Sequence, residues 1–364
     1  MKILTVLGTR PEIIRLSGII PMLDQISEHA VVYTGQNFDA SLSTQFFHEF
    51  GLRSPDEQWE VTGRNISQQM PVIWDHMSRT LDRVKPDRVL VLGDTNSGLT
   101  ALVAARAGIP VYHMEAGNRC YDDRVPEEIN RRVIDHVSHI LMPYTYRSME
   151  NLVREGIDRH RIVVTGNPIC EVLEKNAGGI RSSQILERLK LVPREYFLVT
   201  VHRSENVDSP VRLKGIYDAL FQILAIFGMP MVISLHPRTR DRLQREGWSL
   251  NHPAMTVMEP LGFHDFARLE HDAGLVLTDS GTVQEECAIF RVPSVTLRNV
   301  TERPETIECG SNVLAGTECH SIVAAATLAL TQANYGWTPP AEYLRPHVSE
   351  IVSRVLLGES LWRH

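Results

Sequence analysis

Residues Gly93 to Arg132 read GDTNSGLTALVAARAGIPVYHMEAGNRCYDDRVPEEINRR, and this stretch decides the fold. An apolar run before it (Val89 to Leu92) and one within it (Val111 to Met114) each stop at a polar turn, and a helix-like segment lies between them. This pattern predicts two parallel strands joined by a helix, and ligands bind at the carboxyl ends of such strands. We therefore expect Asp94 and Glu115 to lie side by side at one rim.

A third acid is expected at the same rim. Pro126, Glu127 and Glu128 open another helix, with proline in the first turn, where its missing N–H costs nothing. Asp94, Glu115 and Glu127 should then converge.

Composition restricts the class of protein. The chain has 364 residues, 43% of them hydrophobic and 22% charged, which predicts two soluble domains of ordinary size. The net charge is −7 without long blocks of either sign, so neither nucleic acid nor a membrane is expected as a partner. Five cysteines without a CxxC pair, and no His/Cys cluster, argue against a metal or a disulfide framework and predict a reducing compartment. We find no signal peptide or membrane-spanning run, so we expect a cytoplasmic protein.

Alternation of strands and helices runs along the chain and pauses once, between Ile169 and Arg194. It predicts an α/β protein with two doubly wound Rossmann-like domains facing a cleft. The expected domains are residues 1–167 with a returning C-terminal helix in 345–364, and residues 168–344. Among the expected elements are one helix continuing through residues 8–25, a helix over 41–50 and a strand over 162–164.

Two turns suit an anion. Arg10 follows the first strand in GTRPE, and this slightly favours an anion site over an arginine that caps surface carboxylates. Ser280, Gly281 and Thr282 follow a strand and open a helix, which is an arrangement that binds phosphate. An ordinary N-cap followed by acids also fits that sequence, and Glu286 either holds ribose hydroxyls or favours the helix dipole.

Histidines and an arginine follow other strands of the second half. His202 and His236 each stand beside an arginine at a strand end, and Arg303 lies in a later loop. A lone histidine is more often structural, but two such pairs on the ligand side favour function. Residue types alone therefore indicate a two-domain enzyme for a phosphorylated ligand, without a metal site.

The motifs resemble those of the non-hydrolysing UDP-N-acetylglucosamine 2-epimerases, which have the glycosyltransferase-B fold. Seven occur in that family's order: GTRPE at Gly8, GDT at Gly93, EAG at Glu115, PEExNR at Pro126, HRxEN at His202, DSGxxQEE at Asp279 and TERPE at Thr301. The resemblance implies a catalytic cluster of Asp94, Glu115, Glu127 and His202. It also implies a UDP-sugar as ligand, a homodimer and no cofactor. The substrate-binding residues that it implies are Arg10, Ser280, Gly281 and Thr282 at the diphosphate, Glu286 at the ribose, Phe266 near uracil, His236 and Arg303 on the nucleotide side, and Arg15 where a lysine is usual.

The implied reaction interconverts UDP-GlcNAc and UDP-ManNAc for cell-surface polysaccharide precursors. The C2 proton is not next to a carbonyl, so its removal must accompany departure of UDP from C1. The resulting 2-acetamidoglucal is then protonated and re-attacked by UDP on its other face. One carboxylate must act as base while another group is the acid, and crowding of the three acids should push their pKa values apart.

Other parts of the sequence depart from the glucosamine enzymes. The short spacer from Asn118 to Val125, with HPRTR at His236 and PLGFHD at Pro260, is closer to epimerases that form UDP-N-acetyl-L-fucosamine from UDP-2-acetamido-2,6-dideoxy-L-talose. A hydrolysing epimerase and a glycosyltransferase of the same fold are further alternatives. Asn37, after Gln36, replaces a histidine of the second UDP-GlcNAc site in the bacterial glucosamine enzymes, which predicts epimerisation without an obligatory second substrate molecule.

Overall fold

A computed structural model describes residues 1–35, 46–61, 65–333 and 336–358. The chain forms two compact units, Met1–Leu173 with Glu342–His364, and Glu174–Ala341. The boundaries expected from the sequence lie a few residues away. Helix α8 (Ile169–Lys175) remains with the first unit as far as Leu173, where its Glu171 accepts a hydrogen bond from the Ser349 N–H at 3.0 Å.

The first unit is built on a six-stranded parallel sheet in the order β3-β2-β1-β4-β5-β6. Its strands are β1 (Lys2–Leu7), β2 (Glu28–Tyr33), β3 (Glu57–Gln58), β4 (Arg88–Leu92), β5 (Val111–Met114) and β6 (Ile140–Met142). Its helices are α1 (Arg10–Leu16), α2 (Ile19–Ile26), α4 (Ile66–Val84), α5 (Thr100–Arg106), α6 (Pro126–Val137), α7 (Tyr146–Arg154), most of α8, and α18 (Val348–Leu357), with a 3₁₀ turn at Arg159–Arg161. Since β1, β4 and β5 are parallel neighbours, the turns after Leu7, Leu92 and Met114 share one edge of the sheet.

The second unit repeats this architecture with the strand order β12-β11-β10-β7-β8-β9. Its strands are β7 (Phe197–Val201), β8 (Met231–Leu235), β9 (Met255–Met258), β10 (Leu275–Thr278), β11 (Ser294–Thr296) and β12 (Asn312–Leu314). Its helices are α9 (Ala177–Ser182), α10 (Ile185–Leu189), α11 (Ser204–Val207), α12 (Pro210–Phe227), α13 (Pro237–Arg245), α14 (Phe263–Asp272), α15 (Gly281–Phe290), α16 (Pro304–Glu308) and α17 (Cys319–Gln332). Together the two units confirm the predicted α/β class with two Rossmann-like sheets.

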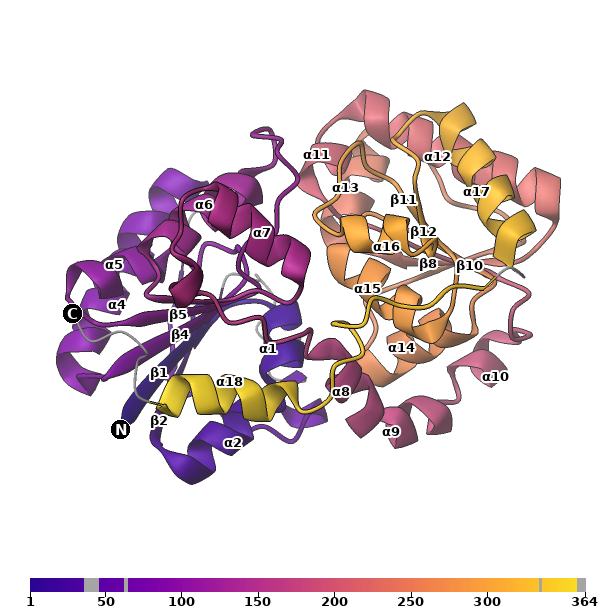
Figure 1. The fold of residues 1–364 in the computed structure, drawn as a ribbon. Helices are drawn as coiled ribbons and strands as arrows, with labels where there is room; N and C mark the ends of the chain where they lie inside the picture. The colour runs from indigo at the N-terminus through magenta and orange to yellow at the C-terminus, as the bar shows by residue number, and fades with distance from the viewer. Residues whose placement is uncertain (36–45, 62–64, 334–335, 359–364) are drawn as a thin grey trace. The chain divides into compact units, whose positions relative to one another are not determined.

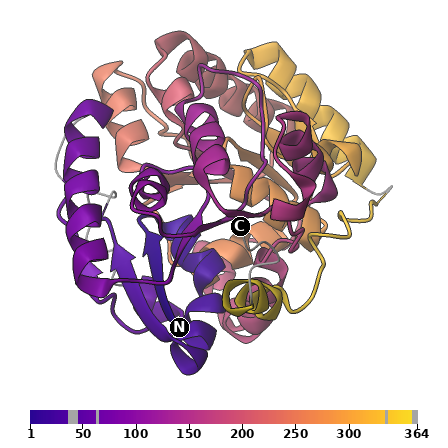
Figure 2. The same cartoon turned by 60° about the vertical axis from the view of Figure 1, so that its left-hand side comes forward.

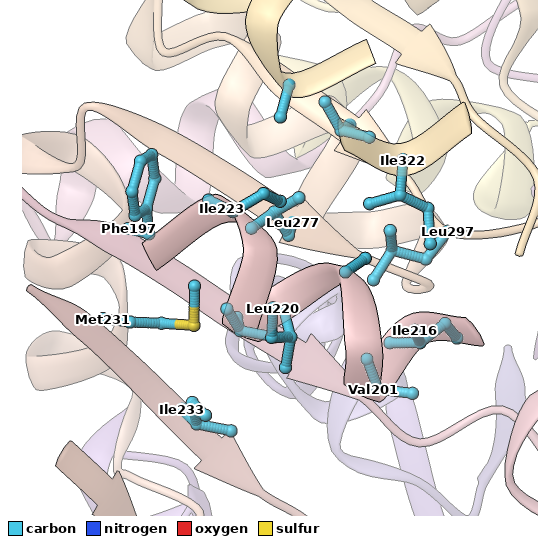
Figure 3. Close-up of a cluster of buried hydrophobic side chains, with 14 of the residues drawn as sticks. Phe197, Val201, Ile216, Leu220, Ile223, Met231, Ile233, Leu277, Leu297 and Ile322 are labelled. Carbon is cyan, nitrogen blue, oxygen red and sulfur yellow. The ribbon is translucent and has the colours of Figure 1, made fainter. Parts of the chain in front are cut away.

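Apolar strands buried on both faces explain why both sheets form. In the second unit, side chains of β7, β8 and β10 pack against one side of α12 (Figure 3). Phe197 and Val201 from β7 meet Ile216, Leu220 and Ile223 from α12 in this core. Such a core holds the strand ends, and therefore the turns that follow them, in fixed positions.

Two expected elements differ from the structure. The helix expected over residues 8–25 is broken into α1 and α2 at Ser17 and Gly18, because Pro21 cannot donate to the carbonyl four residues earlier and its ring would clash with it. The strand expected over 162–164 is an isolated bridge between Ile162 and Leu141. The helix expected over 41–50 falls partly outside the described residues, and residues 46–49 are helical.

The last described helix, α18, packs against α2 of the first unit (Figure 1). Both views show the yellow α18 beside the indigo segment that contains α2 (Figure 2). The Arg88 guanidinium donates to the Leu356 carbonyl oxygen, which ties the end of α18 to the start of β4. Within the described ranges, every helix is too short or too polar to cross a bilayer.

Candidate active site

The turn after β1 is organised by a buried carboxylate, Glu12. Its Oε2 accepts hydrogen bonds from the N–H groups of Gly8 (2.8 Å) and Thr9 (2.6 Å), and its Oε1 accepts from the Thr95 hydroxyl (3.0 Å). Glu12 therefore joins the turn after β1 to the turn after β4. Arg10, in the first of these turns, lies 5.3 Å from the centre of the Phe46 ring, and burial lowers its pKa.

Asp94, in the turn after β4, is held by helix α6. The Arg131 Nε donates to Asp94 Oδ2 at 2.7 Å, and the Asn130 side-chain amide donates to the Asp94 carbonyl oxygen at 2.9 Å. Arg131 also donates to the buried Glu128 at 2.9 Å. The aspartate side chain keeps 19% of its surface exposed, so it remains accessible to a ligand.

Glu115, in the turn after β5, is buried against Arg15 of α1. The Arg15 Nη1 donates to Glu115 Oε2 at 2.8 Å, and the Asn118 amide donates to Oε1 at 3.3 Å. Glu115 has φ of 64°, which is uncommon for a non-glycine residue, and such strained backbone is enriched at active sites. Its Oε2 lies 3.9 Å from where a Cβ on Gly93 would stand, so the turns after β4 and β5 are in contact.

The structure thus brings Asp94 and Glu115 together at one sheet edge. Asp94 and Glu115 each have an arginine partner, and Glu127 lies half-buried in the first turn of α6, whose next turn contacts Asp94. Arg15, expected at the substrate, pairs with Glu115, and its contact with the substrate stays a prediction. The sequence analysis missed Arg131, although its position one helical turn after Glu127 could have indicated it.

In the second unit, Asp279 at the end of β10 holds the His202 loop. Its carboxylate accepts from the N–H groups of His202 (3.0 Å) and Arg203 (2.9 Å) and from the Asn206 amide (3.1 Å). The His202 Nδ1 also lies 3.3 Å from Asp279 Oδ1. The His236 ring is centred 6.2 Å from the His202 ring, so the two expected histidines are neighbours.

Helix α15 begins at the turn predicted to bind phosphate. Ser280 occupies the N-cap position, but its hydroxyl contacts the Thr282 hydroxyl at 3.0 Å rather than capping a backbone N–H of the helix. A Cβ on Gly281 would lie 2.7 Å from Glu302 Oε1 and 3.8 Å from Arg303 Cζ. Arg303 therefore stands at the same helix end, where its Nε is paired with Glu285.

Glu286 and Phe266 lie on neighbouring helices, α15 and α14. Glu286 is buried, and it faces the fully buried Glu270 of α14. Burial, followed by the charge of Glu286, raises the pKa of Glu270 well above its usual value. Phe266, one turn before Glu270, packs on the apolar cluster beneath α14 and is half-buried.

Gln36 and Asn37, on which the prediction about a second substrate molecule depends, lie outside the described residues. Nothing in the structure tests that prediction.

Two Rossmann-like units, one with acids at strand ends and one with an open helix N-terminus beside histidines and an arginine, define an enzyme of the glycosyltransferase-B fold. A family model described as UDP-N-acetylglucosamine 2-epimerase matches residues 23–357. The chain belongs to this UDP-N-acetylglucosamine 2-epimerase family, which confirms the resemblance seen in the motifs.

Individual relatives give the same assignment. The UDP-N-acetylglucosamine 2-epimerase of Methanocaldococcus jannaschii is 38% identical over 353 residues, covering 93% of this chain and 95% of the relative. The crystal structure of the Methanocaldococcus jannaschii UDP-GlcNAc 2-epimerase in complex with UDP-GlcNAc and UDP has a TM-score of 0.92 and 37% identity, and the match covers 98% of this chain and 99% of that chain. The UDP-2,3-diacetamido-2,3-dideoxy-D-glucuronate 2-epimerase of Pseudomonas aeruginosa is 39% identical over 334 residues, covering 91% of this chain and 92% of the relative.

Proposed function

We propose that this protein is a non-hydrolysing UDP-N-acetylglucosamine 2-epimerase that interconverts UDP-GlcNAc and UDP-ManNAc. The observation that carries the proposal is the placement of Asp94 and Glu115 at adjacent strand ends, each with an arginine partner, in a chain of this family. The relative solved with UDP-GlcNAc and UDP supports a UDP-sugar as the substrate.

The reaction proceeds by elimination and re-addition. A carboxylate takes the C2 proton, the C2–H electrons form the C1–C2 double bond, and the C1–O electrons leave with UDP. The 2-acetamidoglucal then receives a proton at C2 on its opposite face while a UDP oxygen bonds again to C1. Asp94, Glu115 and Glu127 supply the base and the acid for these two proton transfers. Arg15 orients Glu115, and Arg131 orients Asp94.

The second unit holds the nucleotide in this proposal. The N–H groups at the start of α15, with Ser280 and Thr282, bind the diphosphate and stabilise the charge that develops as UDP leaves. His202 contacts Asp279 through Nδ1, so we assign its Nε2 to the diphosphate. His236 and Arg303 add polar contacts, Glu286 holds the ribose, and Phe266 packs near uracil. From the first unit, Arg10 is assigned to the diphosphate.

Proton NMR in deuterated water tests the reaction. With UDP-GlcNAc as substrate, we expect UDP-GlcNAc and UDP-ManNAc that both carry deuterium at C2, without accumulation of free sugar. Accumulation of UDP with free N-acetylmannosamine would indicate a hydrolysing enzyme instead. Recovery of undeuterated UDP-GlcNAc alone would refute the proposed activity on this sugar.

The division of roles is tested by matched variants. Asp94→Asn and Glu115→Gln should each lower kcat by about 10²- to 10⁴-fold, the usual contribution of a general acid or base, and leave UDP affinity within about threefold of the parent. Glu286→Ala should chiefly weaken UDP binding, measured by calorimetry. Parental turnover by both acid variants would show that the acids are structural.

One specific observation favours a second candidate substrate. The Pseudomonas relative, named for a diacetamido-glucuronate sugar, is as similar to this chain as the glucosamine relatives are, and the short spacer resembles that of the L-fucosamine-forming enzymes. The alternative is therefore the same C2 chemistry on another UDP-N-acetylhexosamine, such as UDP-2-acetamido-2,6-dideoxy-L-talose. The rate of deuterium incorporation at C2 gives kcat/KM for each UDP-sugar. Comparing this value for UDP-GlcNAc, the diacetamido-glucuronate sugar and the talose sugar identifies the preferred substrate. A homodimer and a cytoplasmic location stay predictions.

A further inference from the structure

A histidine interrupts the apolar strand β5 and is fully buried there. His113 has no exposed surface, and each of its ring nitrogens faces an oxygen. Nε2 lies 2.9 Å from the Gly93 carbonyl oxygen, and Nδ1 lies 2.8 Å from Asp135 Oδ1. Because a carbonyl oxygen can only accept, Nε2 carries a proton, and a second proton must lie between Nδ1 and Asp135.

Asp135, on α6, is fully buried as well and continues the chain of contacts. Its Oδ2 accepts from the Gly117 N–H at 3.1 Å and lies 2.8 Å from the Arg119 Nη1. Burial by itself would raise the pKa of Asp135, but the hydrogen bonds and charges of His113 and Arg119 lower it below the ordinary value. The carboxylate form of Asp135 is therefore favoured, and that form can accept from both the Gly117 N–H and the Arg119 guanidinium.

The two ends of this pair contact the backbone of two particular turns. The Gly93 carbonyl belongs to the peptide that precedes Asp94, and Gly117 lies two residues after Glu115. Gly117 has φ of 79°, and a Cβ there would lie 2.2 Å from the Ser148 carbonyl oxygen, so the turn cannot shift toward α7. The Asp135 carboxylate holds the same turn through the Gly117 N–H.

We propose that His113 and Asp135 are positioning residues that hold Asp94 and Glu115 in their reactive arrangement by fixing the Gly93 and Gly117 peptides. This inference rests on the proposed function, because it assigns catalytic roles to the two acids. A histidine in an apolar strand is more often only a satisfied core residue. Here, however, the hydrogen bonds of the pair go to the turns after β4 and β5.

The same sheet contains a matched control. His29 on β2 contacts Asp24 through Nδ1 at 2.7 Å and the Thr5 hydroxyl through Nε2 at 2.8 Å. Its side chain is fully covered and has a carboxylate partner, but its contacts are with β1 and α2 rather than with the acid-bearing turns. Asp24 also pairs with Arg53. Asp24→Asn should lower stability without changing kcat.

Three variants at the pair separate positioning from stability. Asp135→Ala removes the acceptor for the Gly117 N–H, and we expect kcat to fall about 100-fold, as ångström-scale misplacement of catalytic groups does, with KM and UDP affinity unchanged. Asp135→Asn keeps an acceptor for Gly117 and offers an N–H to a neutral His113, so it should recover activity to within about tenfold of the parent. His113→Asn keeps a donor to Asp135 and loses the one to Gly93, so it should slow the reaction through the Asp94 turn alone.

Hydrogen–deuterium exchange of the backbone provides a readout that does not depend on activity. In Asp135→Ala, residues 93–97 and 115–119 should both exchange faster, whereas in His113→Asn only residues 93–97 should. Parental kcat with unchanged exchange in both variants would overturn the inference, as would an equal loss of kcat in Asp24→Asn. If Asp135→Ala does not fold, the exchange of His113→Asn decides.

The failure of the proposed function is recognised separately. If the parent protein places no deuterium at C2 of any tested UDP-sugar, the catalytic assignment fails. The exchange pattern then decides whether the pair fixes the two turns. Faster exchange confined to those turns supports the structural part of the inference, and parental exchange refutes it.

Discussion

Titration of the buried Glu12 provides a direct test of how the turn after β1 is stabilised. Burial raises the pKa of this carboxyl from the ordinary 4.5 to about 7, although hydrogen bonds from Gly8, Thr9 and Thr95 act in the opposite direction. The folded protein therefore binds the Glu12 proton more tightly than the unfolded chain does. This contribution to the free energy of unfolding is complete below about pH 4.5 and is lost as the pH rises through 7.

The size of the effect follows from the two pKa values. At about 1.4 kcal/mol per pKa unit, the interval from 4.5 to about 7 corresponds to about 3 kcal/mol. Glu12→Gln removes the titration and leaves the other groups in place. The free energy of unfolding of the parent minus that of Glu12→Gln should therefore fall by about 3 kcal/mol between about pH 4.5 and pH 8.

Urea unfolding at closely spaced pH values measures this difference. Trp248→Phe and Trp337→Phe, introduced into both proteins, leave tryptophan only in the first unit, so fluorescence reports the unit that contains Glu12. Glu28→Gln, at an exposed carboxylate of the same unit, controls for the loss of one negative charge. A difference that stays constant from pH 4.5 to pH 8 would show that the hydrogen bonds fully offset burial, and a difference that rises with pH would show that they outweigh it; either result would refute the reasoning.

Three further outcomes are expected. Arg15→Gln should lower kcat by about 10²-fold and destabilise the first unit by about 3 kcal/mol or more, because Glu115 is left buried without its partner. Steady-state kinetics measures the first effect and urea unfolding the second. Parental values of both would contradict the pairing. Gly281→Ala should weaken UDP binding at least about tenfold in calorimetry, since its Cβ would stand 2.7 Å from Glu302 Oε1, and unchanged affinity would remove α15 from the site. The saturation curve for UDP-GlcNAc should be hyperbolic, and the reverse reaction should start without added UDP-GlcNAc. A lag that a trace of UDP-GlcNAc abolishes would show that a second site operates.

Apolar runs ending at polar turns were sufficient to predict most of the sheet. Val89 to Leu92 and Val111 to Met114 are strands β4 and β5 as expected, because strands buried on both faces must be apolar throughout. The edge strands β3 and β12 were not predicted, since Glu57–Gln58 is polar and Asn312–Leu314 begins with an asparagine, so neither forms a continuous apolar run. The break before α2 could have been predicted from Pro21.

The positions of Asp94 and Glu115 at the sheet edge could be predicted from the sequence, but the arginines that pair with them could not. Asp94 and Glu115 follow from strand ends, whereas their arginines come from other elements, and only the fold specifies which arginine meets which acid. The buried His113 interrupts an apolar run, which was a visible signal. Its partner Asp135 lies on α6, and no local pattern connects the two.

The return of α18 to the first unit has a consequence for biosynthesis. The second unit is one continuous segment, Glu174–Ala341, and can fold as soon as it has left the ribosome. The first unit is complete only when α18, which is translated after the whole second unit, packs against α2. Until α18 has been translated, α2 of the nascent chain lacks the helix that packs against it. The unit whose synthesis begins first is therefore completed last.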